Sequence, residues 1–203
     1  MNAAQQRDLT DLRQAAQERN HEQMQYMLKR LLQGVGYYPA LGIVAERLYD
    51  FLDIFESYYP DEAWVRNLLV ALVSFGTSPD DSVAQMALQQ AFSAPGCGNY
   101  VKAVYDLVQS TQAKHTPEAR VGYMASAIVN VNMAVLAEAW YGEREDDWQR
   151  VRQQQIDPQT GQSSDPQAAR ISANFWLDDS TTALDTAMWL EVADRVEKAL
   201  KRQ

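Results

Sequence analysis

Apolar residues recur every three or four positions along most of this 203-residue chain, which is the spacing of one face of an α-helix. The first segment shows the series Leu9, Leu12 and Ala16, followed after a polar stretch by Met24, Met27, Leu28 and Leu31. No segment alternates as a strand does, and the hairpin dipeptides Asn-Gly and Asp-Gly do not occur in the sequence. The pattern therefore predicts an all-α fold.

Proline, glycine and capping residues mark the ends of the expected helices. Gly34 and Gly36 close the first segment, residues 1–33, whose polar middle fits one long helix or two. Further helices are expected over residues 39–57, 60–75, 78–92, 99–112, 117–141, 166–175 and 182–202. An acidic turn at residues 143–147 is expected to lead into a polar helix that ends near residue 155. We expect seven to nine helices in a single domain, 1–203, arranged as a bundle or a short array of helical hairpins. Residues 1–33 are a candidate N-terminal helical arm.

The segment 117–141 is the most apolar and contains 17 consecutive residues without a charge, Val121 to Ala137. A membrane span needs roughly 20 predominantly apolar residues and usually has basic flanks. Here Ser126, Asn130 and Asn132 interrupt the run, and the acidic residues Glu118 and Glu138 stand near its two ends. A buried core helix is the better interpretation.

The C-terminal part of the chain predicts a polar loop followed by a strongly amphipathic helix. Residues 156–167 hold two Asp-Pro pairs and few apolar groups, which is typical of a flexible loop. In the helix 182–202 the residues Leu184, Met188, Val192, Val196 and Leu200 form an i, i+4 ridge, with Trp189 and Ala193 beside it. Thr182 and Asp185 resemble a capping pair at its start. The wide apolar face fits packing on the same domain or docking on another subunit.

Residues 48–73 align with residues 104–129 when the chain is shifted by 56 positions. Seven positions are identical, and both segments place a proline-bearing helix start at the same point. A duplicated helical hairpin explains the match, and so does chance similarity between two amphipathic hairpins, because stable arrays usually need about three repeats.

Composition and charge narrow the function classes. The chain carries 18 basic and 27 acidic residues, a net charge of −9, and most of the excess lies in residues 61–148. A phosphate-tracking groove needs clustered Lys and Arg, so nucleic-acid binding is disfavoured. The polar N-terminus lacks the apolar stretch of a signal peptide, which indicates a cytoplasmic protein.

With one cysteine and two histidines, the chain has few side chains that could act as metal ligands or as a thiol nucleophile. No metal site, cofactor motif or catalytic set is predicted, and the chain is expected not to be an enzyme. Cys97 is the one outside candidate, because it stands between two glycines before a helix start, where a thiol pKa can fall. His21 or His115 would have to supply the base from elsewhere in the chain.

Two Tyr-Tyr-Pro triplets and a few polar groups on apolar helices are the candidate binding residues. The triplets span residues 37–39 and 58–60, each before an expected helix, and the aromatic rings fit an interaction groove or simple core packing. The candidate interaction or ligand surface comprises Tyr37, Tyr38, Tyr58, Tyr59, Trp64, Tyr123, Asn130, Asn132 and Trp189.

Two functions are compatible with this sequence. The first is a non-enzymatic protein–protein interaction module, such as an adaptor, a scaffold or a small subunit of a larger assembly, whose partner is another protein or a second copy of the chain. The second is a helical bundle that binds a small apolar or aromatic ligand around Asn130, Asn132, Tyr123 and the tyrosine-rich turns.

Overall fold

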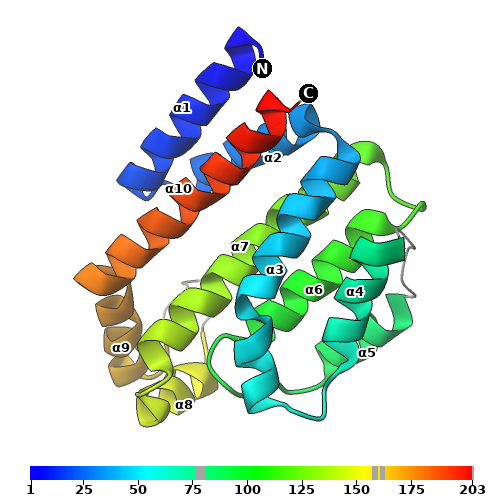
Figure 1. Ribbon diagram of the computed structural model, residues 1–203. Coiled ribbons are helices and arrows are strands. Elements are labelled where there is room, and N and C mark those ends of the chain that lie inside the picture. The colour runs from blue at the N-terminus through cyan, green and yellow to red at the C-terminus, as the bar shows by residue number, and fades with distance from the viewer. Residues whose placement is uncertain (76–80, 157–159, 161–162, 203) are drawn as a thin grey trace.

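The computed structural model describes residues 1–75, 81–156, 160 and 163–202. Over these residues the chain forms ten α-helices and no strand, which confirms the all-α prediction (Figure 1). The helices are α1 (Ala3–Glu18), α2 (His21–Val35), α3 (Tyr37–Tyr58), α4 (Trp64–Phe75), α5 (Asp81–Gln89), α6 (Cys97–Thr111), α7 (Pro117–Tyr141), α8 (Glu145–Gln153), α9 (Pro166–Leu177) and α10 (Asp179–Lys201). The count is one above the expected range, and the first segment contributes two helices.

The break between α1 and α2 has a local cause. Arg19 ends α1 in the left-handed conformation, with φ of 54°, and the side chain of Asn20 accepts a hydrogen bond from the N–H of Gln23 to cap α2. Both helices then pack into the body of the molecule, α1 against α2 and α10, and α2 against α7. Residues 1–33 are therefore part of the bundle in this structure.

Helix starts agree with the predictions where the cap is local. Thr116 caps α7 with Pro117 at its first position, and Asp165 caps α9. The start of α10 differs, because Asp178 accepts hydrogen bonds from the N–H groups of Ser180 and Thr181, so the helix begins at residue 179 rather than 182. The α3 and α6 helices also begin two residues early, and α4 begins four residues after Pro60. The expected cap at residues 78–79 lies outside the described residues.

The long apolar helix α7 is the centre of the bundle. It packs against α2, α3, α6 and α10, and Met124, Ile128 and Val131 on it are fully buried (Figure 1). By length and composition alone α7 is able to cross a membrane, but half of its most apolar window is buried against other helices. Its apolar character is therefore accounted for by the core.

Two hydrophobic clusters hold the helices together. The larger cluster takes residues from α1 to α7 and from α10. It includes Trp189, Val192, Val196 and Leu200, so the apolar face of α10 packs on its own domain. The smaller cluster joins the end of α7 to α9 and α10 and consists of Leu136, Ala137, Tyr141, Ile171, Phe175 and Met188.

Both segments of the 56-residue internal match fall on a helix–turn–helix. Residues 48–73 cover the end of α3 and most of α4, and residues 104–129 cover the end of α6 and half of α7. The two pairs pack differently, because α6 and α7 contact each other extensively whereas α3 and α4 contact each other much less. In the predicted loop 156–167, Ile156 and Ser163 form an isolated antiparallel bridge, while residues 157–159 and 161–162 lie outside the described part of the chain.

Candidate functional site

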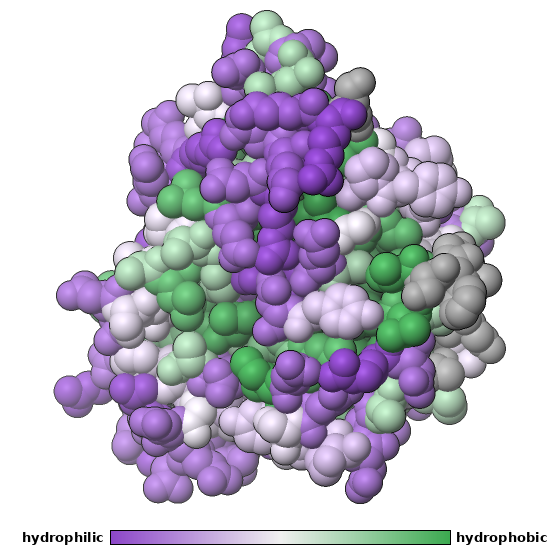
Figure 2. Space-filling model, viewed as in Figure 1, coloured by the Kyte–Doolittle hydropathy of each residue, from purple (hydrophilic) through white to green (hydrophobic). Residues whose placement is uncertain are grey.

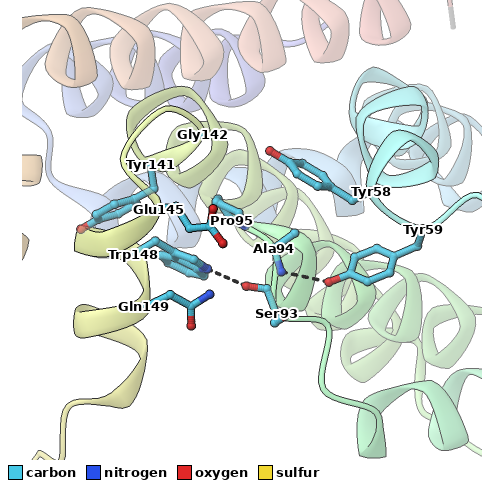
Figure 3. A pocket seen from close by; sticks show the side chains of 10 residues that line it. All are labelled: Tyr58, Tyr59, Ser93, Ala94, Pro95, Tyr141, Gly142, Glu145, Trp148 and Gln149. Carbon is cyan, nitrogen blue, oxygen red and sulfur yellow. Dashed lines mark hydrogen bonds between the residues drawn. The ribbon is translucent and has the colours of Figure 1, made fainter.

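A pocket of about 290 Å³ opens where the end of α3, the loop before α6, the end of α7 and the start of α8 meet (Figure 3). Four of the residues that line it are aromatic, and one is a carboxylate. The lining residues are Tyr58, Tyr59, Ser93, Ala94, Pro95, Tyr141, Gly142, Glu145, Trp148 and Gln149. Pockets for small ligands hold roughly 300–1,000 Å³, so this one suits a small molecule.

The loop of residues 93–95 is held from two sides by aromatic side chains. Trp148 Nε1 donates to the carbonyl oxygen of Ser93 at 2.6 Å, and the N–H of Ala94 donates to the hydroxyl of Tyr59 at 2.9 Å (Figure 3). The loop therefore connects α3 and α8, which do not follow each other in sequence, and fixes the distance across the pocket.

Gly96 brings this loop against α7. Its φ is 73°, a value that favours glycine, and a Cβ at this position would lie 2.2 Å from the carbonyl oxygen of Ala134. The glycine is thus required both by its backbone conformation and by the close approach of the two backbones. It sets the depth of the loop relative to the central helix.

The aromatic walls are supported from behind. The Tyr59 ring packs against Phe55 and Phe92, with ring centroids 5.4 and 5.1 Å away. The Tyr141 ring stacks on Phe175 at 5.4 Å and lies 5.2 Å from Trp148. Tyr58 is the exception, because its side chain is 39% exposed and forms the open edge of the pocket. The site is therefore largely pre-formed, with one part-exposed tyrosine at its rim.

Two carboxylates give the pocket a negative electrostatic character. Glu145 lines it directly, and Glu138 lies behind Gly142, where an added Cβ would be 3.1 Å from Glu138 Oε1. Burial raises the pKa of the Tyr58 hydroxyl, and the charges of Glu138 and Glu145 raise it further. Neither carboxylate forms an ion pair within the described part of the chain. The nearest arginine in sequence, Arg144, instead stacks over the Trp140 ring at 4.1 Å.

Cys97 lies close to this site but is fully buried. Burial raises its thiol pKa to about 12, and the charge of Glu138 acts in the same direction. A reactive cysteine needs a lowered pKa and access to solvent. The environment of Cys97 therefore gives no support to the thiol chemistry considered from the sequence.

The structure separates the two tyrosine pairs that the sequence grouped together. Tyr37 and Tyr38 begin α3, whereas Tyr58 and Tyr59 stand at its other end, about 30 Å away at the helical rise of about 1.5 Å per residue. Only the second pair reaches the pocket. Tyr37 lines a different hollow near the start of α7, where the guanidinium of Arg120 lies 3.9 Å from the centre of its ring.

The two asparagines of α7 form hydrogen bonds with different helices. Asn130 Nδ2 donates to the carboxylate of the buried Asp106 at 3.2 Å, which also accepts from Ser126. Asn132 Oδ1 accepts from Arg47 Nε at 2.9 Å. Both amides bond to other helices, so they do not form one ligand surface.

The remaining candidates are also dispersed. Trp189 is buried in the main core, and Trp64 is half-buried against it at the start of α4. The Tyr123 ring lies 4.9 Å from the ring of His115. None of the three lines the pocket between α3 and α8.

Four residues of this site are not among the candidate binding residues named from the sequence. Three of them line the pocket, namely Tyr141, Glu145 and Trp148, and the fourth, Glu138, lies behind Gly142. One signal is available for Trp148, which is the single aromatic residue in the mainly polar helix α8. Within the described residues no three His, Cys, Asp or Glu side chains are grouped to hold a metal ion.

No protein-family model, curated protein or solved structure matches this chain.

Proposed function

We propose that this protein binds a small organic molecule in the pocket between α3 and α8. The observation that carries the proposal is the double anchoring of the 93–95 loop by Tyr59 and Trp148, which fixes one wall of an aromatic-lined cavity. Binding sites for small molecules are usually concave, lined by aromatic groups and largely pre-formed. This proposal develops the second of the two functions considered from the sequence, at a site that shares only Tyr58 and Tyr59 with the candidate residues named there.

The proposal is tested with three probes of the same shape and different charge: choline, the neutral 3,3-dimethylbutan-1-ol, and 3,3-dimethylbutanoate. Ligand-observed NMR is expected to detect at least one of them with a Kd below about 1 mM, a binding free energy of about −4 kcal/mol. Tyr58→Ala is expected to abolish the signal, because it removes a wall of the pocket at a tolerant, part-exposed position.

Tyr38→Ala is the matched control, since Tyr38 is an exposed tyrosine at the other end of the same helix. It is expected to leave binding unchanged. Binding that is equal in wild type and Tyr58→Ala, or no binding of any probe at millimolar concentration, would overturn the proposed function.

An interaction module is a second candidate function, favoured by the apolar surface of α4. Val70 and Val73 are exposed on this helix although Val65, Leu69 and Leu72 are buried beneath it. Figure 2 shows apolar surface on the right of the view, where α4 lies at the edge of the molecule. We propose a second copy of the chain as the occupant, because a twofold dimer places the same apolar patch of two molecules against each other.

Sedimentation velocity tests this second candidate. The wild type is expected to form a dimer at micromolar concentration, and Val73→Asp is expected to return it to a monomer without loss of folding, since Val73 is exposed. Ser57→Asp, a change at an exposed position of α3, serves as the charge control. A wild type that remains monomeric would remove this candidate.

A further inference from the structure

We infer that the pocket between α3 and α8 selects an organic cation whose ammonium nitrogen is covered by methyl groups. This inference rests on the proposed function and specifies the class of ligand. It follows from what the walls offer to a ligand and from what they lack.

The aromatic walls offer a large ring surface, and the lining holds no charged hydrogen-bond donor. The indole N–H of Trp148 is already used by Ser93, and the hydroxyl of Tyr59 already accepts from Ala94. Figure 3 shows the rings of Tyr58, Tyr59 and Trp148 among the side chains that line the cavity. The negative face of an aromatic ring attracts a cation within about 6 Å of its centre, most strongly for Trp and Tyr.

The carboxylates supply the charge that such a cation needs. Glu145 lies in the wall, Glu138 lies behind Gly142, and both act on the Tyr58 hydroxyl from nearby. No Lys or Arg side chain lines the cavity. An anionic ligand would be repelled by these carboxylates, and the lining holds no cationic side chain to offset that repulsion. A cation would instead be attracted by two carboxylates that have no ionic partner within the described residues.

Methyl substitution follows from the balance between ring surface and hydrogen-bond acceptors. A primary ammonium carries three N–H donors and is strongly hydrated, so it loses hydrogen bonds when rings surround it. A trimethylammonium group has no donor and spreads its charge over its methyl groups. It therefore gives up little hydration when it moves from water into the pocket. Its methyl groups gain contact there with the aromatic rings of Tyr58, Tyr59 and Trp148.

The three probes of equal shape separate this inference from the proposed function. In isothermal titration, choline is expected to bind at least about tenfold more tightly than 3,3-dimethylbutan-1-ol, which replaces the nitrogen by carbon, and 3,3-dimethylbutanoate is expected not to bind. Ethanolamine, which has the same chain and no methyl groups, is expected to bind more weakly than choline.

Variants of the walls assign the selectivity to named groups. Glu145→Gln is expected to weaken choline binding about threefold or more and to leave the neutral probe unchanged, because only the charge is removed. Trp148→Phe keeps a ring but loses the hydrogen bond to Ser93, and it is expected to weaken choline as well. Gln153→Glu, outside the pocket on the same helix, is the charge control.

A trimethylammonium group also occurs on lipid headgroups and on methylated lysine side chains. Free N-trimethyl-lysine and flotation with phosphatidylcholine vesicles distinguish these sources, and Tyr58-dependent binding of either supports the same chemistry. Equal or tighter binding of the neutral probe, or of ethanolamine, overturns the inference while the proposed function stands. Failure of all probes overturns both.

Discussion

The hydroxyl of Tyr59 accepts a hydrogen bond from the backbone N–H of Ala94 at 2.9 Å, across 35 residues of sequence. This bond fastens the end of α3 to the loop that leads into α6. Because the Ala94 N–H is partly buried, it has no ready replacement for the acceptor. The relationship makes Tyr59 a structural support of the pocket as well as part of its wall.

Tyr59→Phe is expected to lower the free energy of unfolding by about 1–2 kcal/mol, because it leaves the Ala94 N–H without its acceptor and removes nothing else. Urea unfolding followed by circular dichroism measures the change. Tyr58→Phe is the matched control and is expected to change stability by less than about 0.5 kcal/mol, since it makes the same chemical change at an exposed rim position. Equal effects of the two variants would contradict the role given to Tyr59.

Substitution of glycine by alanine is expected to change stability in opposite directions at two positions. Gly96→Ala is expected to cost about 3 kcal/mol or more, because φ is 73° and the new Cβ would overlap the carbonyl of Ala134 at 2.2 Å. Gly122→Ala is expected to stabilise the protein by about 0.5–1 kcal/mol, because this glycine lies inside α7 with nothing within 4 Å of an added Cβ. Thermal unfolding of both variants checks the pair, and a stable Gly96→Ala protein would contradict the described loop geometry.

The fold was predictable because its signals are local. The boundaries of α7 follow from Thr116, Pro117 and Gly142, all within one turn of the helix ends, and they were predicted to the residue. The start of α10 was misplaced because Asp185 resembles a capping residue in sequence. In the structure it is buried, and its carboxylate lies 2.9 Å from His21 Nε2, 164 residues away.

The candidate site was only partly predictable, because long-range contacts create it. Tyr58 and Tyr59 were chosen for their aromatic character, but the length of α3 separates them from the tyrosines they were grouped with. Trp148 joins them through a hydrogen bond to Ser93, 55 residues away. Nothing in the periodicity of α8 indicates such a contact, since it depends on how the helices are arranged around α7.

A buried arginine connects α3, α7 and α10. Arg47 Nε donates to Asn132 at 2.9 Å and Nη1 donates to Asp50 at 2.7 Å, while Nη2 has no partner. Arg195 on α10 also donates to Asp50, at 3.0 Å. In Figure 2 a polar band crosses the centre of the view, over α3 and α10. The network holds three helices together, but its orphan donor leaves part of the desolvation cost of Arg47 without compensation.

Arg47→Ala is expected to destabilise the protein by about 3 kcal/mol, because it leaves a cavity and an unpaired amide at Asn132. The double variant Arg47→Met/Asn132→Leu is expected to recover most of this loss, since it removes both polar groups and refills the space. Denaturant unfolding of Arg47→Met, Asn132→Leu and the double variant completes the double-mutant cycle that measures the coupling. Arg66→Ala, which breaks exposed ion pairs to Asp53 and Glu56, is the control and is expected to cost less than about 1 kcal/mol. A double variant less stable than Arg47→Ala would show that the polar network is required.

The ion pair of Glu197 at the contact between α1 and α10 is expected to make the stability of the protein depend on pH. Hydrogen bonds from Arg13 and then from Lys201 lower the pKa of its carboxyl to about 2, against an ordinary value of 4.5. A carboxyl whose pKa is lower in the folded state stabilises the protein above the unfolded pKa. That contribution is lost as the pH falls from 4.5 toward 2.

Glu197→Gln is therefore expected to lower Tm at pH 7 and to have a diminishing effect as the pH falls below 4.5, until the two proteins melt together near pH 2. Because Arg13 reaches Glu197 from the other helix at 2.6 Å, the effect at pH 7 is also expected to shrink in 1 M salt, where the Debye length is about 3 Å. Asp194→Asn removes the more exposed of the two carboxylates that Arg13 contacts and is expected to have a smaller effect. Thermal scans at several pH values measure all three proteins. A difference between wild type and Glu197→Gln that persists at pH 2 would place the effect in packing rather than in the charge of Glu197.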